Sequence, residues 1–400
     1  MKSAFIYDAL RSPRGRAREG ASLNSLTPQA LLQQLYGALV ARTQLDPAQV
    51  DDVILGCVTQ QGEQAGNIAK TSTLYAGWPG SVPGLTVNRY CSSGIDAIAL
   101  AALKVGAGQA QVTVAGGIEM MSRVPMLSDQ ARVFMDPGFA ARCQMLMMGN
   151  GADLIASLHG ITREQADAVA LASQQRAAHA SEQGWFSSIV PITLEDGTRV
   201  DQDECVRAGT TAEQLAAMPP AFAKSGAAGI DAFQQASYPQ LAHIEHIHTA
   251  GNSPAMADGA ALVLVADEAW GISNGVKPRA RITATATVNA DPLQVLSGCI
   301  EATRKLLADQ SLTSADIDLF EIHEAFAAIS VVAMQTLGID DDKLNVNGGV
   351  IALGHPMGAT GAIMAGTLVD ELERRGLRWG VVSAAGAAGT GSALLLERLG

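Results

Sequence analysis

The chain has 400 residues, which is too many for one hydrophobic core and is consistent with two or three domains. Hydrophobic residues make up 48% of it, so a large core can be buried. A net charge of −12 argues against a nucleic-acid partner, which would require a basic face. Because no apolar run is long and uninterrupted enough to span a bilayer, we also expect no membrane partner.

The cysteines and the N-terminal residues indicate the cellular compartment of the protein. The five cysteines are widely spaced, and no pair has the spacing of a zinc or redox motif. We therefore expect reduced thiols and no bound metal. Segment 1–7 indicates a first strand rather than a signal peptide, because it contains no apolar core region or cleavage site. These features together predict a cytoplasmic protein.

Apolar, strand-like segments alternate with alanine-rich helical segments at the start of the chain. This alternation is typical of a mostly parallel, buried sheet. The pattern predicts strands at 3–7, 52–55, 84–87 and 111–115, the last ending at Gly116-Gly117, and helices at 27–43, 67–76 and from 95 onward.

The pattern changes between about residues 119 and 240, where methionine-rich and loop-like segments surround one clear helix at 162–183. We interpret this part as an insertion that carries its own helices rather than a sheet. Long insertions often bind substrate, although a simple spacer would have the same appearance. The alternation then resumes, with strands expected at 260–266, 278–288 and 318–322 and a helix at 291–307.

A weak internal repeat relates the two ends of the chain. Segment 85–88 leads through a loop and a helix to the strand at 111–115, and segment 344–347 leads through a glycine-rich loop and a helix at 359–374 to a strand at 380–384. Two similar halves around a pseudo-twofold axis would bring both turns to one cleft.

Cys91 lies in the turn between the strand at 84–87 and the helix that follows. Free backbone N–H groups and the positive end of the helix dipole would then point at its sulfur. Such an environment lowers the pKa of a thiol and favours the nucleophilic thiolate. The alternative is a buried structural cysteine.

Three further segments carry polar groups suited to catalysis. His355 lies among glycines just before a helix, where it is poorly placed for core packing. His323 and Glu324 follow a strand, at the sheet edge where α/β active sites lie, although Glu324 could simply favour the helix dipole. Segment 383–393 is a loop of small residues that offers backbone N–H donors, or else a tight turn between strands. One cysteine and two histidines fit acyl transfer through a thioester.

These segments resemble the motifs of the thiolase family, in the family's order and over nearly the whole chain. The resemblance is carried by Asn88–Gly94, Gly116–Ser122, Thr249–Asn252, Asp258–Ala260, His323–Phe326 and Asn345–Gly361. It implies an α/β, five-layered αβαβα fold of two similar halves. Residues 1–120 and 249–270 would form the N-terminal half, 121–248 an inserted loop domain that binds coenzyme A, and 271–400 the C-terminal half. It also implies a homodimer or homotetramer, and acyl-CoA as a substrate with no permanently bound cofactor.

The same resemblance assigns roles to single residues. Cys91 would be the acylated nucleophile and His355 the base that activates it. At the position of His323, the fatty-acid-degrading branch of the family also has histidine. His323 would help to hold a thioester oxygen through a water molecule. The remaining assignments are Gly386 and Ala387 in the oxyanion loop, and Met148 and Ser253 near the coenzyme A tail.

One position departs from the family pattern. Thiolases normally carry a second reactive cysteine in the last loop, which moves the α-proton of the substrate. Alignment on the loop glycines puts Ala385, whether natural or introduced, at that position. Alanine cannot transfer a proton, and such general acid–base help is worth about 10²–10⁴-fold in rate.

The sequence therefore predicts a thiolase-type acyltransferase acting on acyl-CoA thioesters, by thiolysis of 3-ketoacyl-CoA or by Claisen condensation, through an acyl-Cys91 intermediate. Ala385 is expected to impair or alter the reaction. One alternative is a decarboxylating ketosynthase-like condensing enzyme that uses Cys91, His323 and His355, because loss of CO₂ generates the carbanion without α-proton abstraction. The others are acyl-enzyme hydrolysis and a non-catalytic, acyl-CoA-binding pseudo-thiolase.

Overall fold

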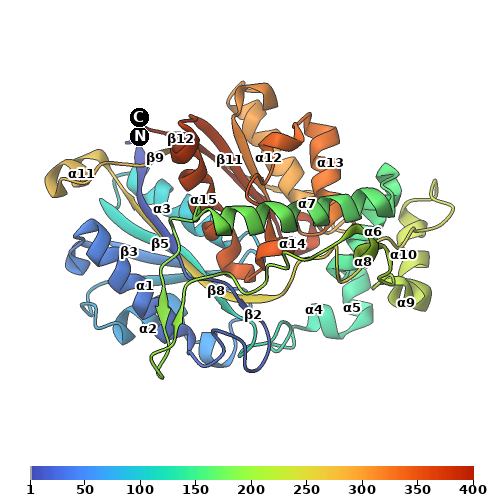
Figure 1. Ribbon diagram of the computed structural model, residues 1–400, viewed down its shortest axis with the longest axis horizontal. Coiled ribbons are helices and arrows are strands. Elements are labelled where there is room, and N and C mark those ends of the chain that lie inside the picture. The colour runs from blue at the N-terminus through green and yellow to red at the C-terminus, as the bar shows by residue number, and fades with distance from the viewer. Residues whose placement is uncertain (1) are drawn as a thin grey trace.

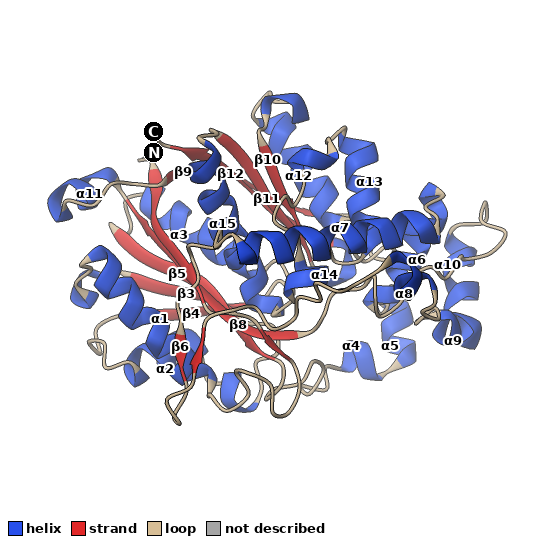
Figure 2. Ribbon diagram, viewed as in Figure 1, coloured by secondary structure: helices blue, strands red, loops and turns tan. Residues whose placement is uncertain are grey.

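The computed structural model describes residues 2–400. Within them, ten strands form one mixed sheet in the order β10-β11-β12-β9-β1-β8-β5-β3-β4, with the short β2 paired to β8 (Figure 2). Their bounds are β1 Ala4–Arg11, β2 Gly15–Arg16, β3 Asp52–Gly56, β4 Gly84–Val87, β5 Val112–Met120, β8 Ala257–Ala266, β9 Ala280–Asn289, β10 Leu319–Ile322, β11 Trp379–Ala385 and β12 Thr390–Arg398.

The two halves of this sheet repeat one order of strands. In the first half, β5 lies between parallel β3 and antiparallel β8, and β1 follows β8. In the second half, β11 lies between parallel β10 and antiparallel β12, and β9 follows β12. The halves meet where β1 pairs with β9. A parallel bridge from Leu344 to Phe320 takes the place that β4 has beside β3. The repeat in the sequence is therefore a repeat in the fold.

Layers of helices alternate with the two halves of the sheet (Figure 1). Between the two halves lie α3 (Ser93–Gly106) and α15 (Met357–Arg375), whose apolar residues share one core with strands of both halves. The outer face of the first half is covered by α1 (Pro28–Thr43) and α2 (Ile68–Tyr75). The outer face of the second half is covered by α12 (Gly298–Asp309) and α13 (Ala327–Leu337). The five-layered α/β fold expected from the sequence is confirmed.

The two central helices touch through their backbones. A Cβ atom on Gly94 would lie 2.7 Å from the backbone nitrogen of Ala362, and one on Gly361 would lie 2.6 Å from the backbone nitrogen of Ile95. Only glycine permits this approach. Because Cys91 precedes α3 and His355 precedes α15, the contact also brings the two residues to one place.

Replacing Gly361 with alanine should therefore lower the free energy of unfolding by about 1–3 kcal/mol, the usual cost of overpacking a core. The matched control is Gly37→Ala in α1, where an added Cβ meets no atom within 4 Å. That change should be neutral, or stabilising by about 0.5–1 kcal/mol through helix propensity. Urea unfolding of both variants makes the comparison, and equal effects would contradict the close crossing of the helices.

The inserted segment contains mainly helices, which gather at one end of the molecule with α7 lying across the front (Figure 1). The expected helix at 162–183 is α7, and it begins with a capping box between Thr162 and Gln165. A short hairpin, β6–β7, also forms here, so the expectation of helices alone was incomplete. The elements are α4 Arg132–Met135, α5 Pro137–Arg142, α6 Met148–His159, α7 Arg163–Glu182, β6 Ile192–Thr193, β7 Arg199–Val200, α8 Ala212–Ala216, α9 Ala223–Ser225 and α10 Asp231–Ser237. Outside the insertion are α11 Glu268–Asn274 and α14 Val350–Leu353.

Two predicted boundaries were wrong, each for a local reason. Strand β5 continues through Gly116 and Gly117 instead of ending there. A Cβ on either residue would overlap the carbonyl oxygen of Ala261 or Gly358, so these glycines permit close packing within a strand. The helix expected from residue 291 begins only at Gly298, because segment 290–297 bonds to the last loop instead and Val295 takes a positive φ of 62°.

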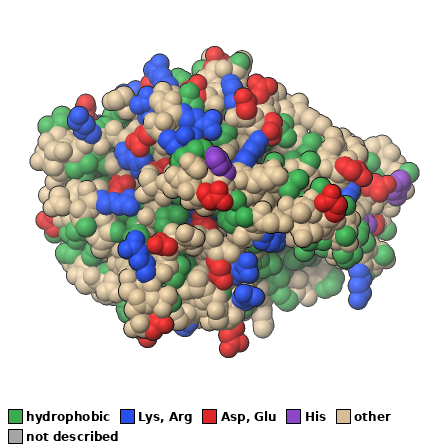
Figure 3. All heavy atoms as spheres, in the orientation of Figure 1, with side chains coloured by type: hydrophobic (Ala, Val, Ile, Leu, Met, Phe, Trp, Pro, Cys, Tyr) green, Lys and Arg blue, Asp and Glu red, His purple; other side chains and the backbone are tan. Residues whose placement is uncertain are grey.

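On the face shown in Figure 3, acidic and basic side chains are interspersed. Among the helices of residues 2–400, none combines the length and the apolar character that crossing a membrane requires.

Candidate active site

Cys91 lies in a tight turn between β4 and α3. The preceding residue, Tyr90, takes a left-handed backbone conformation with φ 49°, an unusual geometry that often occurs at functional sites. The turn is fixed to the second half of the fold, because the Ser92 hydroxyl donates a 2.8 Å hydrogen bond to the carbonyl oxygen of Ala384. Cys91 therefore sits where the two halves meet.

His355 lies beside this cysteine, with Nε2 3.1 Å from Cys91 Sγ. On its other side, Nδ1 is 2.7 Å from Oγ1 of Thr360, whose hydroxyl donates in turn to the carbonyl oxygen of Pro356. Because that hydroxyl proton is used, Thr360 accepts the Nδ1–H of the imidazole. The Nε2 lone pair is left to receive the thiol proton, which is the arrangement that a general base needs.

The titration of this pair differs from the sequence-based prediction. Burial, and secondarily the charge of Glu119, raises the pKa of the Cys91 thiol to about 12. Burial also lowers the pKa of His355 well below its usual range, and His323 and Arg14 add to the effect. The prediction that the helix terminus lowers the thiol pKa was wrong, because burial outweighs the backbone N–H group that favours the thiolate. The resting pair is a neutral thiol and a neutral imidazole.

Alkylation of Cys91 by iodoacetamide should therefore keep accelerating between about pH 6 and about pH 10, because only the thiolate reacts and its fraction grows until the pH reaches the pKa. Peptide mass mapping measures the rate at this residue separately from that at the exposed Cys143. A rate that reached a plateau near neutral pH would indicate a preformed thiolate–imidazolium pair and would contradict the neutral one.

His323 follows β10, and its ring packs against that of His355 with 4.5 Å between ring centroids. The residue is 2% exposed, and within residues 2–400 neither ring nitrogen has a hydrogen-bond partner. Burial lowers its pKa to about 4, and the nearby backbone of Ala385 only partly opposes this shift. The ring is consequently a neutral imidazole that lies beside the backbone of Ala385.

Glu324, the next residue, points elsewhere. Its carboxylate accepts hydrogen bonds from the Ser173 hydroxyl at 2.8 Å and from the Ile351 backbone nitrogen at 3.2 Å. It thus connects β10 to α7 and α14, a structural role that differs from the simple dipole effect considered for it.

A cavity of about 170 Å³ opens onto Cys91, His323 and His355. Met148 and Ser253, the two residues expected near the coenzyme A tail, both line it. A second cavity of about 170 Å³ shares Cys91 and Met148 and is lined by Ala387. Large apolar residues that line one or both cavities include Met121, Met126, Phe134, Phe222, Met256 and Met357. Methionine side chains adapt to different shapes, which suits a wall against a flexible ligand.

The last loop passes close to the same site. Ala385 ends β11 and is buried in the cluster that also contains the cavity-lining Leu296 and Ala325. Its neighbour Gly386 packs so closely on the Cys91 turn that a Cβ there would lie 2.8 Å from the carbonyl oxygen of Arg89. The Gly386 N–H donates to the carbonyl oxygen of Thr390 at 2.8 Å.

The sequence and the fold match known proteins over the whole chain. The thiolase N-terminal domain model matches residues 4–233, and the thiolase C-terminal domain model matches residues 276–398. The chain belongs to the thiolase family. It is thus a member of a family of acyltransferases, as the motifs predict.

Individual members of this family align from end to end. The 3-oxoadipyl-CoA/3-oxo-5,6-dehydrosuberyl-CoA thiolase of Escherichia coli is 38% identical over 100% of both chains. A 3-ketoacyl-CoA thiolase of Shewanella baltica is also 38% identical over 100% of both chains. The crystal structure of the Bacillus anthracis acetyl-CoA acetyltransferase superposes with a TM-score of 0.87 at 35% identity, covering 100% of this chain and 99% of that one.

Glu119, a residue that supports the site, was not predicted from the sequence. Its buried carboxylate accepts hydrogen bonds from the backbone nitrogens of Val58, Thr59 and Gly358 at 2.9–3.0 Å, and from Gln64 Nε2 at 2.8 Å. It therefore joins the end of β3 to the start of α15. A charge inside an apolar strand, between Ile118 and Met120, was the available signal.

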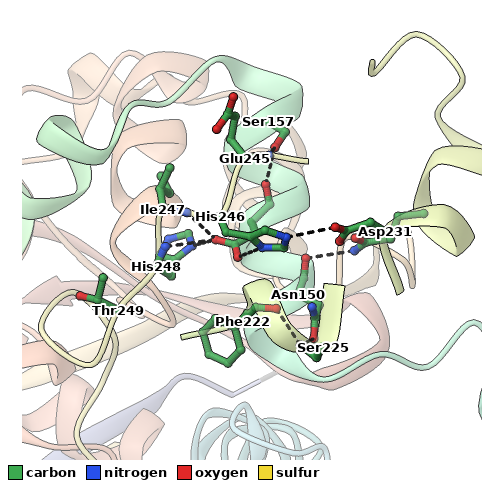
Figure 4. Close-up of polar contacts among 12 residues, drawn as sticks. Asn150, Ser157, Phe222, Ser225, Asp231, Glu245, His246, Ile247, His248 and Thr249 are labelled. Atoms are coloured by element: carbon green, nitrogen blue, oxygen red, sulfur yellow. Dashed lines mark hydrogen bonds and ion pairs between the residues drawn. The ribbon is translucent and has the colours of Figure 1, made fainter. Parts of the chain in front are cut away.

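A polar cluster fixes one wall of the cavity (Figure 4). Buried Asp153 of α6 lies 2.8 Å from Nδ1 of His246 and 2.7 Å from Nδ1 of His248, and Nε2 of His246 lies 3.1 Å from Asp231. The His248 ring packs edge-on against Phe326, 5.2 Å between centroids, and Phe326 lines the cavity. These histidines therefore support the wall instead of touching a ligand.

Proposed function

We propose that the chain is a thiolase-type acyltransferase that acts on 3-ketoacyl-CoA thioesters, by thiolysis or by Claisen condensation, through an acyl-Cys91 intermediate. The observation that carries the proposal is the contact of 3.1 Å between Cys91 Sγ and Nε2 of His355, whose tautomer is fixed by Thr360. The names of the similar thiolases, which act on 3-oxoadipyl-CoA and 3-ketoacyl-CoA, support this substrate class.

In thiolysis, the thiol proton of Cys91 moves to His355 while the sulfur attacks the 3-keto carbonyl carbon. The bond between C2 and C3 breaks, which gives acyl-Cys91 and the enolate of acetyl-CoA, and a proton is then added at C2. Free coenzyme A attacks the acyl-enzyme and releases the shortened acyl-CoA. Because the N–H of Gly386 is bonded to Thr390, we assign the oxyanion donor of the last loop to Ala387.

The insertion, residues 121–248, is proposed to bind coenzyme A between halves formed by 1–120 with 249–270 and by 271–400. Met148 comes from this insertion and Ser253 from the chain just after it, and both line the cavity at Cys91. Acyl-CoA is then a substrate that comes and goes, and the scheme requires no permanently bound cofactor.

A second candidate follows from Ala385, which we assign to the position where thiolases carry a proton-transferring cysteine. A decarboxylating ketosynthase-like reaction would use the same Cys91, His323 and His355 but would need no α-proton abstraction. A non-catalytic pseudo-thiolase has less support, because the pairing of Cys91 with His355 has no purpose in a protein that only binds acyl-CoA.

The purified protein mixed with acetoacetyl-CoA and free coenzyme A tests the proposal, with acetyl-CoA measured by chromatography. Formation of acetyl-CoA would support the thiolase reaction. Condensation with a malonyl thioester but none with acetyl-CoA alone would favour the decarboxylating alternative. Neither product with either substrate pair would contradict both.

We further propose a homodimer, or a dimer of such dimers. Strand β4 lies at the edge of the sheet, and Leu85 on it, Leu103 on α3 and Tyr75 at the end of α2 are 41%, 54% and 55% exposed. An apolar edge of this kind favours pairing with a second copy. Light scattering measures the mass, and a monomer would contradict the proposal.

A further inference from the structure

We infer that His323 is the acid–base group that moves the proton at the α-carbon of the acyl-CoA substrate. This inference rests on the proposed thiolase reaction and names the group that performs its carbon-acid step. It differs from the role expected for His323 in the sequence, which was to help hold a thioester oxygen.

The residues around the cavity restrict the choice. Of the side chains that line the cavity at Cys91, those of Cys91, His323 and His355 are the acid–base groups. His355 is engaged on both sides, by Cys91 and by Thr360. The nearby carboxylate of Glu119 is engaged by four N–H donors.

His323 has the opposite character. It is 2% exposed, it lines the cavity, and within the described chain from residue 2 to 400 neither of its ring nitrogens is hydrogen-bonded. Burying an imidazole without hydrogen-bond partners destabilises the fold, and an apolar side chain could fill the same space without this cost. A substrate group that enters the cavity could therefore hydrogen-bond to this ring.

The resting His323 ring is neutral, because burial lowers its pKa to about 4. A neutral ring has a lone pair that can accept a proton, and the protonated ring is a strong acid that returns the proton readily to the enolate. The His355 ring packs against the His323 ring at 4.5 Å between centroids, and Nε2 of His355 lies 3.1 Å from Cys91 Sγ, so His323 lies beside the reacting pair.

The condensation step balances with one proton. His323 takes a proton from C2 of acetyl-CoA, and the electron pair of that C–H bond becomes the enolate. C2 then bonds to the carbonyl carbon of acetyl-Cys91, the bond from that carbon to sulfur breaks, and the leaving Cys91 thiolate is protonated as His323 gives up the proton that it took from C2. In thiolysis these transfers run in the opposite direction. Cleavage of the bond between C2 and C3 gives the enolate of acetyl-CoA, and protonated His323 then donates its proton to C2.

Substitution by asparagine separates proton transfer from the holding of an oxygen, because an amide can donate hydrogen bonds but cannot act as a base near neutral pH. The experiment uses acetyl-CoA in D₂O and measures deuterium entering the methyl group by mass spectrometry. Acetylation of Cys91 is measured in the same samples by intact mass. His243→Asn is the matched control, because His243 is exposed and pairs with Glu245.

We expect His323→Asn to lower the exchange rate by about 10²-fold or more, as for the loss of a general base, while Cys91 is still acetylated. The double variant His323→Asn, Ala385→Cys should recover exchange, because it returns a proton-transferring thiol beside the cavity. Unchanged exchange in His323→Asn would overturn the inference. So would a parallel loss of exchange and acetylation that Ala385→Cys does not rescue, or a wild-type protein that is acetylated without exchange. A wild-type protein that is not acetylated at all would instead overturn the proposed function.

Discussion

Replacing Cys91 with serine should abolish acyl transfer, with turnover falling by about 10⁴-fold or more, as for the loss of the nucleophile in other covalent enzymes. A serine hydroxyl is far less acidic than a thiol, and His355, whose pKa is already depressed by burial, cannot deprotonate it effectively. Steady-state formation of acetyl-CoA from acetoacetyl-CoA and coenzyme A measures the effect.

The control for this variant is Cys143→Ser, which removes an exposed thiol. It should leave turnover unchanged. If the Cys91→Ser protein kept a tenth or more of the activity, roughly the range of an indirect effect, Cys91 would not be the acylated residue.

A gain of activity is expected from Ala385→Cys. A thiol at this position would add a second proton-transferring group next to His323, and should raise the rate of carbon–carbon bond making and breaking by about 10²-fold. Acetylation of Cys91 should change little, because that step does not involve the α-carbon. Condensation of acetyl-CoA and thiolysis of acetoacetyl-CoA, measured separately from acetylation, make the comparison.

Ala385→Ser is the matched control, because it adds a side chain of similar size that does not transfer protons near neutral pH. It should show no gain. Equal rates for Ala385→Cys and the wild-type protein would mean that this position does not face the reacting carbon, and that its alanine does not limit the reaction.

Much of the fold could be predicted from the sequence. The alternation of apolar strands with alanine-rich helices gave the central strands, and the repeat of 85–88 at 344–347 gave the two matching halves. Cys91 and His355 could be placed together because each precedes one of the two central helices, α3 and α15, of the repeated halves. The local sequence was sufficient to place these two residues, because each motif lies within a single turn between a strand and a helix.

The properties that were predicted wrongly, or not at all, depend on contacts between distant segments. The direction of the Cys91 pKa shift is set by burial and by Glu119, and neither can be read from the turn itself. The hydrogen bond from His355 to Thr360 lies within a helix start, but its meaning depends on the orientation of the ring. The cluster around Asp153 joins residues about 95 positions apart, as in its contact with His248.

The central claim is that Cys91 carries the acyl group, and the most direct test is the mass of the intact protein after it is mixed with acetyl-CoA. We predict an increase equal to one acetyl group, located on the Cys91 peptide, which disappears when free coenzyme A is added and reappears as acetyl-CoA. Absence of the adduct, or an adduct on another residue that resists coenzyme A, would contradict the account.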